Sequence, residues 1–182
     1  MPSPLRHTPR RHRGLSAVES LVGAAIVTTT LATAAGSIVS WRTQLGVQQA
    51  AAEFETDVHH ARSLALARNE TIRLSLAPAP DGSCWIIHSG PRDACRCLGG
   101  GRAECSAAGE ALRVAHWPAG QPVRLDANVR SVAFDPLHGT ASPALTVRIS
   151  AAGARPVHQV VSIMGRVRSC VPGGGLSGYR AC

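Results

Sequence analysis

The stretch from Leu15 to Val39 constrains the chain more than any other, because it is almost entirely apolar and carries a single charge, Glu19. About 25 residues of helix would be roughly 37 Å long, enough to cross a bilayer core of about 30 Å. The stretch therefore predicts a hydrophobic transmembrane or filament-core helix over residues 15–40. A bare carboxylate in lipid costs about 2.5–3.5 kcal/mol, so Glu19 is expected to have a partner.

Three interpretations of this stretch compete. A cleaved secretory signal would combine a basic head, an apolar middle and an Ala-x-Ala site at Ala32-Thr33-Ala34. A plain membrane anchor is the second interpretation, and both leave Glu19 unexplained. In the third, a basic leader over residues 1–14 ends in Gly14, a new N-terminus begins at Leu15, and Glu19 is the fifth mature residue.

The third pattern resembles the signature of type IV prepilins. The resemblance implies that a prepilin peptidase cuts after Gly14 and that the new amine of Leu15 is methylated. It also implies that Glu19 pairs with the amine of a neighbouring pilin during assembly, which is reasonable because a carboxylate in hydrocarbon is tolerated when a cation meets it. The basic leader favours a cytoplasmic head, an anchor in the bacterial inner membrane and a periplasmic body over residues 41–182.

Beyond the apolar stretch, the helix is predicted to continue to about residue 68. Apolar residues recur there at spacings of three and four, which is typical of a helix that lays one stripe on a sheet: Val47, Ala51, Phe54, Val58, Ala61 and Ala65. The polar residues Gln48, Glu53, Asp57 and Arg62 are expected to point elsewhere. The pair His59-His60 lacks the i, i+4 spacing and the nearby acid of a metal site, so both are interpreted as solvated.

After Asn69 the pattern changes to period two, which predicts a β-sheet over residues 70–168. Short strands are expected at 71–76, 84–88, 111–117, 123–125, 129–134, 145–150 and 157–164. A loop is expected at 91–109 and a Gly-rich tail at 169–182. Short strands separated by Gly and Pro imply an antiparallel sheet packed on the helix, so the fold class is α+β.

The six cysteines predict disulfides, because the body is expected to lie outside the cytoplasm. Cys105 is expected to pair with Cys95 or Cys97, and sequence alone does not decide which. Zinc is disfavoured because only Cys95 and Cys97 are close in sequence. Cys170 and Cys182 bracket the Gly-rich tail, and a bond between them would close it and hold Arg180 near Arg166 and Arg168.

Charge indicates a polyanion as a partner. The net charge of the chain is +8, and it stays near 8 − 4 = +4 without the leader arginines Arg6, Arg10, Arg11 and Arg13. Arg166 and Arg168 are two residues apart, so in a strand they would share a face, and paired guanidinium groups suit phosphate oxygens. A solvated basic sheet edge would look the same from sequence.

Two further stretches carry a family resemblance. The segment QQAAAEFETDVHHARSLALARNETIRLSL and the C-terminal Gly165-Arg166-Val167-Arg168 resemble FimT-type minor pilins and the H-type pseudopilins (GspH) of type II secretion. The resemblance implies the type IV pilin fold and, for the FimT type, a DNA-binding patch used in natural transformation. Here that patch would comprise Arg166, Arg168 and Arg180, with Arg130 nearby.

The sequence shows no catalytic constellation, such as a Gly-x-Ser-x-Gly or His-Glu-x-x-His motif, and neither a metal nor a cofactor is expected. Two functions remain open. The first is a minor pilin that binds DNA during transformation. The second is a structural subunit, either a minor pseudopilin of a type II secretion system or a minor pilin that primes pilus assembly.

Overall fold

The computed structural model describes residues 16–121 and 123–182, with the backbone alone described for residues 30–37. The chain divides into two compact units, residues 1–39 and residues 40–182, and each is described by itself. Helix α1 runs from Ala17 to Arg68 and contributes to both. The long N-terminal helix that the sequence predicts is therefore present over the described residues.

A polar side chain caps the start of α1. The backbone N–H of Glu19 donates a hydrogen bond to Ser16 Oγ at 3.2 Å, which is the geometry of an N-cap. Glu19 lies in the first turn, where the helix dipole favours a carboxylate. Glu19 thus has a local function in the helix, and its predicted pairing with another subunit stays a prediction. Gly14 and Leu15 lie outside the described residues.

Within the described part of the chain, none of the helices combines the length and the apolarity needed to cross a membrane. The span predicted for residues 15–40 stays a prediction.

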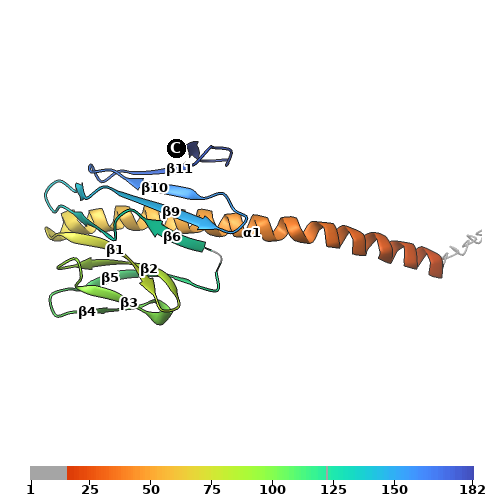
Figure 1. Cartoon of the computed structure of the whole chain (residues 1–182), viewed down its shortest axis with the longest axis horizontal. Coiled ribbons are helices and arrows are strands. Elements are labelled where there is room, and N and C mark those ends of the chain that lie inside the picture. Colours follow the sequence, from red (N-terminus) through yellow and green to blue (C-terminus); the bar gives the residue numbers. More distant parts are fainter. Residues whose placement is uncertain (1–15, 122) are drawn as a thin grey trace, which may run out of the picture. The chain divides into compact units, whose positions relative to one another are not determined.

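The unit of residues 40–182, here called the body, is built from strands that lie along the second half of α1 (Figure 1). The strands and one short 3-10 helix are β1 Ile72–Ala79, β2 Gly82–Ser89, β3 Cys95–Leu98, η1 Gly99–Gly101, β4 Arg102–Cys105, β5 Ala111–Pro118, β6 Val123–Ala127, β7 Ser131–Phe134, β8 Ala141–Ser142, β9 Leu145–Ala151, β10 Val157–Val161, β11 Val167–Val171 and β12 Arg180–Ala181.

These strands form two large sheets. Sheet A has the order β5-β2-β1-β7-β8, and sheet C has the order β12-β11-β10-β9-β6. Every pairing is antiparallel except that of β11 with β12, which is parallel. The predicted α+β class and helix-on-sheet packing are confirmed, although the sheet is divided in two.

The predicted helical stripe forms the centre of the core. All six residues of that stripe and Ala50 are fully buried against residues from both sheets. Alanine supplies four of these seven positions, and its small side chain lets strands approach the helix closely. Phe54 is the largest of these seven side chains and meets Trp85 of β2 edge to face, with ring centroids 5.4 Å apart.

The polar face of the helix differs from the prediction at Asp57, which is 1% exposed. Its carboxylate accepts a hydrogen bond from Trp85 Nε1 at 2.7 Å and forms an ion pair with Arg113 of β5. Arg113 also forms an ion pair with Glu53, which lies one helical turn before Asp57. Burial, together with the charge of Asp57, raises the pKa of Glu53. A buried carboxylate is tolerated when it is paired and hydrogen-bonded, so Asp57 ties sheet A to α1.

A second buried polar group ties sheet C to the same helix. Gln159 of β10 is fully buried, and its Nε2 donates to the carbonyl oxygen of Ala51 at 2.9 Å. Ser169 of β11 lies within hydrogen-bonding distance of both Gln159 Oε1 and Glu55 of α1. Each large sheet is therefore joined to α1 by apolar packing and by at least one hydrogen bond.

The loop predicted at 91–109 contains a hairpin of β3 and β4, which corrects the sequence interpretation. Cys95 and Cys105 face each other in this hairpin and form a disulfide, while Cys97 pairs with Cys84 of β2. The hairpin thereby encloses a small apolar cluster with Ile86. The third disulfide joins Cys170 and Cys182, as predicted.

The main core and all three disulfides lie within residues 40–182. The body is therefore expected to fold without residues 1–39.

We predict that Asp57→Ala lowers the unfolding free energy of the body by about 2–3 kcal/mol, because Trp85 Nε1 would be left buried without a partner. Chemical denaturation of the 40–182 fragment measures this change. Glu104→Ala is the matched control, because it removes a carboxylate from the exposed ion pair with Arg96 and should cost no more than about 1 kcal/mol. Equal effects of the two substitutions would contradict the assigned role of Asp57.

Candidate nucleic-acid interface

The outer face of sheet C, which is turned away from α1, carries the arginines of the strands. Burial alternates along β9, where Val147 and Ile149 are fully buried and Arg148 between them is exposed. The same alternation on β10 buries Val157 and leaves His158 half-exposed. Because side chains alternate across a strand, one side of the sheet is apolar and the other side carries the charges.

Every strand of sheet C contributes one arginine or histidine to this outer face. We call the set the basic band, and it comprises Arg124 of β6, Arg148 of β9, His158 of β10, Arg168 of β11 and Arg180 of β12. His158 is opposite Arg148 on one side and Cys170 on the other, and Cys170 is opposite Arg180. The register therefore places Arg148, His158 and Arg180 in one row across the sheet. Arg124, opposite Ser150, and Arg168, opposite Val160, each lie two residues away from this row, on opposite sides of it.

The charge of the basic band is largely uncompensated. Asp126, in register with Arg148, is the one acidic residue in the described strands of sheet C. Among the described residues, no side-chain hydrogen bond or ion pair involves the four arginines of the band. Their guanidinium groups are therefore available to an external anion.

The structure brings together two of the three arginines predicted to bind DNA. Arg168 and Arg180 line one groove, together with Val160, Gly178 and the edge of the Cys170–Cys182 disulfide. Arg166 is exposed but lies in the turn before β11 and is not among the residues lining that groove.

The C-terminal tail holds Arg180 beside Arg168. Strand β12 pairs with β11 over two residues, and the Cys170–Cys182 disulfide closes the loop between them. Tyr179 packs partly against the main core, and its burial, with the charge of Glu55 nearby, raises the pKa of Tyr179. A two-residue strand pairing is weak by itself, so the disulfide is the principal restraint on Arg180.

Gly165 of the Gly-Arg-x-Arg motif has a structural function. Its φ is +69°, and a Cβ at this position would collide with the carbonyl oxygen of Gly139. Gly165 ends the tight turn between β10 and β11, in which its N–H donates to the carbonyl oxygen of Ser162. The glycine of the motif therefore allows two turns to meet.

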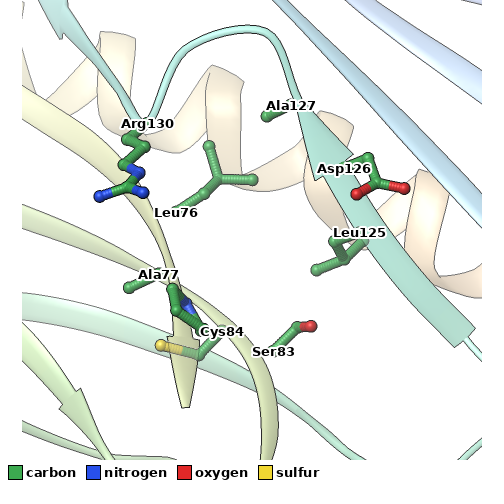
Figure 2. A pocket seen from close by; sticks show the side chains of 9 residues that line it. Leu76, Ala77, Ser83, Cys84, Leu125, Asp126, Ala127 and Arg130 are labelled. Carbon is green, nitrogen blue, oxygen red and sulfur yellow. The ribbon is translucent and has the colours of Figure 1, made fainter.

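Arg130 does not join the basic band, which corrects the prediction that it lies near the C-terminal arginines. It borders a cleft between the end of β1 and strand β6, where Figure 2 shows it on the far side of Leu76 from Asp126. The cleft walls are mainly short or apolar side chains, including Leu76, Leu125 and Ala127.

One polar cluster of sheet A was missed by sequence reasoning. His88 Nε2 lies 2.8 Å from Ser75 Oγ, which lies 2.9 Å from Ser131 Oγ, and all three residues are buried. His88 Nδ1 is 3.0 Å from the carbonyl oxygen of Ser89, and burial lowers the pKa of His88. Burial favours the neutral imidazole, and the hydrogen-bonding contacts among these side chains satisfy polar groups across strands β1, β2 and β7.

His59 and His60 are exposed on α1, as predicted. In the described ranges, no group of three His, Cys, Asp or Glu residues is arranged to hold a metal ion.

A family model described as "Type II transport protein GspH" matches residues 50–165 of the chain. The match ends at Gly165, so Arg166, Arg168 and Arg180 lie beyond it. No curated protein matches the chain.

Among solved structures, the fold is similar to that of the type IV minor pilin FimU of Pseudomonas aeruginosa strain PAO1. The FimU crystal structure in space group P21 has a TM-score of 0.51 and 21% identity, covering 71% of this chain and 94% of FimU. A second FimU crystal form, P65, gives a TM-score of 0.50 and 19% identity over 69% of this chain and 96% of that one. At these identities the likeness concerns the fold.

We predict that Gly165→Ala destabilises the body more than Gly153→Ala does. Both glycines have positive φ, but a Cβ at Gly153 would meet open space. The control should cost about 1–2 kcal/mol for the left-handed backbone alone, and Gly165→Ala should cost more because of the collision with Gly139. Chemical denaturation of the two variants measures the difference, and equal losses would contradict the close approach.

Proposed function

The chain belongs to the type II transport protein GspH family, and we propose that it is a minor pilin that binds DNA through the basic band of sheet C. Membership of this pilin family implies association with other pilins in a filament. The proposal adds a binding activity to that structural role.

The observation that carries the proposal is the set of four arginines on the outer face of sheet C, on four of its five strands, none with a side-chain partner among the described residues. Neighbouring strands lie about 4.8 Å apart, so the band extends over roughly 20 Å from β6 to β12. A DNA duplex advances about 3.4 Å per base pair, so the band matches the length of about six base pairs. Four guanidinium groups at this spacing suit contacts with several phosphates of one backbone.

The band supports recognition of phosphate rather than of bases. The described strands of sheet C contain no Phe, Trp or Tyr, and proteins that hold single strands usually stack bases on such rings. In addition, the strands that carry the basic band are not helices or loops of the kind that read base edges within a DNA groove. The expected binding is therefore sequence-independent and strongly dependent on salt.

The proposed route to the filament follows the prepilin resemblance. A prepilin peptidase would cut after Gly14, the amine of Leu15 would be methylated, and the apolar helix would hold the chain in the inner membrane before assembly. Glu19 would then pair with a neighbouring subunit, and the body would be displayed outside the membrane. DNA capture would serve natural transformation.

A structural subunit without DNA binding is the second candidate. The family match over residues 50–165 favours it, because the matched region does not include the C-terminal arginines. A pseudopilin of a type II secretion system and a minor pilin that primes pilus assembly both fit this description. Neighbouring genes for other minor pilins would favour the pilus, and secretion-system genes would favour the pseudopilus.

We predict that the 40–182 fragment, with its disulfides intact, binds duplex DNA weakly and loses affinity as salt rises. Each phosphate contact contributes about 0.9 to the log–log salt slope. Arg168→Ala/Arg180→Ala should therefore flatten the slope by roughly 1.8 and Arg148→Ala by about 0.9. Fluorescence anisotropy at several salt concentrations measures the slope.

Arg102→Ala is the matched control, because Arg102 is an exposed arginine of the β3–β4 hairpin, outside sheet C. Its slope should equal that of the wild-type fragment. Absence of binding by the wild-type fragment at low salt would reject DNA binding and leave the structural subunit.

We also predict that the Cys170–Cys182 disulfide contributes to binding through Arg180. Cys170→Ser/Cys182→Ser should lower the affinity by about the same factor as Arg180→Ala, since each removes one positioned cation. Combining the three substitutions should cause little further loss, and the difference is measured as a double-mutant cycle. Additive losses would show that Arg180 is held without the disulfide.

A further inference from the structure

The body exposes large apolar side chains at one of its ends. Four of them, each 46–72% exposed, come from segments far apart in sequence, and we call the set the apolar end: Leu66, Leu137, Ile163 and Met164. The other exposed large apolar residues of the body, within its described part, are Trp41 and Leu45 near the start of its helix. Clustered exposure of this kind marks an interaction surface more often than isolated exposure does.

Three segments converge to form the apolar end. Leu66 lies on the last turns of α1 and packs beside Gly139 in the turn between β7 and β8. The turn between β10 and β11 contacts the β7–β8 region, because the N–H of Ala141 donates to the carbonyl oxygen of Ile163 at 2.9 Å. In Figure 1 these segments gather at the end of the body where α1 stops.

Contacts with Arg62 and Gly165 hold the β7–β8 and β10–β11 turns in place. Arg62 of α1 is half-buried, and its Nε donates to the carbonyl oxygen of Gly139 at 2.9 Å. Gly165 packs against both Gly139 and Arg62. The backbone that carries the apolar end is therefore already ordered, which reduces the conformational entropy that the chain loses when a partner binds.

The charge nearest to Ile163 and Met164 in the turn between β10 and β11 is positive, from the exposed Arg166. Arg166, beside Met164, has no side-chain partner among the described residues, while His138 is within 3.2 Å of Asp135. In a symmetric contact centred on the turn between β10 and β11, a second copy of this chain would bring Arg166 near its own equivalent, which is unfavourable. A partner surface with an apolar centre and an acidic rim is complementary.

The apolar end is too small to hold a partner protein by itself. Four side chains provide on the order of a few hundred Å², below the roughly 800 Å² that each protein contributes to a typical stable complex. The contact needs a second attachment that raises the local concentration of the partner. Bundling of N-terminal helices in a filament supplies such an attachment between pilin subunits.

We propose that the apolar end docks on the body of another pilin subunit, one that presents an apolar centre with an acidic rim. The inference rests on the filament membership given under the proposed function and is independent of DNA binding. The apolar end then helps to fix the place of this subunit in the filament, and the helices provide the bulk of the attachment.

The test uses the full-length chain in the bacterium that produces it. Ile163→Ser/Met164→Ser and, separately, Leu137→Ser replace exposed apolar groups in two different turns, and Ala152→Ser in the exposed β9–β10 turn is the control. The measurement is the amount of each variant in sheared filaments, relative to its total cellular amount. Both test variants should be reduced at least fivefold, and the control should equal wild type.

Two further measurements separate the possible failures. The same substitutions in the 40–182 fragment should leave its melting temperature and the salt slope of DNA binding unchanged, which shows that the fold and the basic band are intact. Wild-type incorporation of both test variants would overturn the inference alone. Absence of the wild-type chain from sheared filaments would overturn both the inference and the pilin function.

Discussion

The structure depends on one contact, the packing of two separate sheets on a single face of α1. A helix face is narrow, so both sheets can reach it only if its central residues are small, and Ala50, Ala51, Ala61 and Ala65 meet this condition. Apolar contact alone would let the sheets slide along the helix. The hydrogen bonds of Asp57 with Trp85 and of Gln159 with the Ala51 carbonyl fix their positions, because each bond requires one alignment. With the inner faces used in this way, the outer face of sheet C is left to solvent.

Disulfides order the parts of the body that this packing does not reach. The β3–β4 hairpin lies outside the main core and has its own small cluster, closed by the Cys84–Cys97 and Cys95–Cys105 bonds. The Gly-rich tail is likewise closed by Cys170–Cys182. A body with few aromatic residues has limited apolar area to bury, and cross-links restrict the unfolded chain where burial cannot stabilise the folded one.

The sequence predicted the helix stripe, the fold class and the tail disulfide because each depends on residues close together in the chain. It did not predict the burial of Asp57, since only the positions of Trp85 and Arg113 make a buried carboxylate tolerable. Arg124 and Arg148 were also missed, because their place on the same sheet face as Arg168, 20 or more positions away in the chain, depends on how the strands pair. Arg130 was wrongly expected near the C-terminal arginines for the same reason, because its position beside β6 also depends on the arrangement of strands far apart in the chain. The alternation Cys95-Arg96-Cys97-Leu98 was a signal for the missed hairpin.

The two arginines of the Gly-Arg-x-Arg motif differ in their surroundings, and this links the two proposed surfaces. Arg168 lies within sheet C and faces the groove beside Arg180, whereas Arg166 lies in the turn that also presents Ile163 and Met164. A subunit docked on the apolar end would cover or pair with Arg166 and leave Arg168 accessible. In a filament, the basic band of sheet C would then carry phosphate binding, and Arg166 would serve the contact between subunits. The glycine before them makes this division possible, because it lets the turn pack on Gly139 while the strand continues along the open face of the sheet.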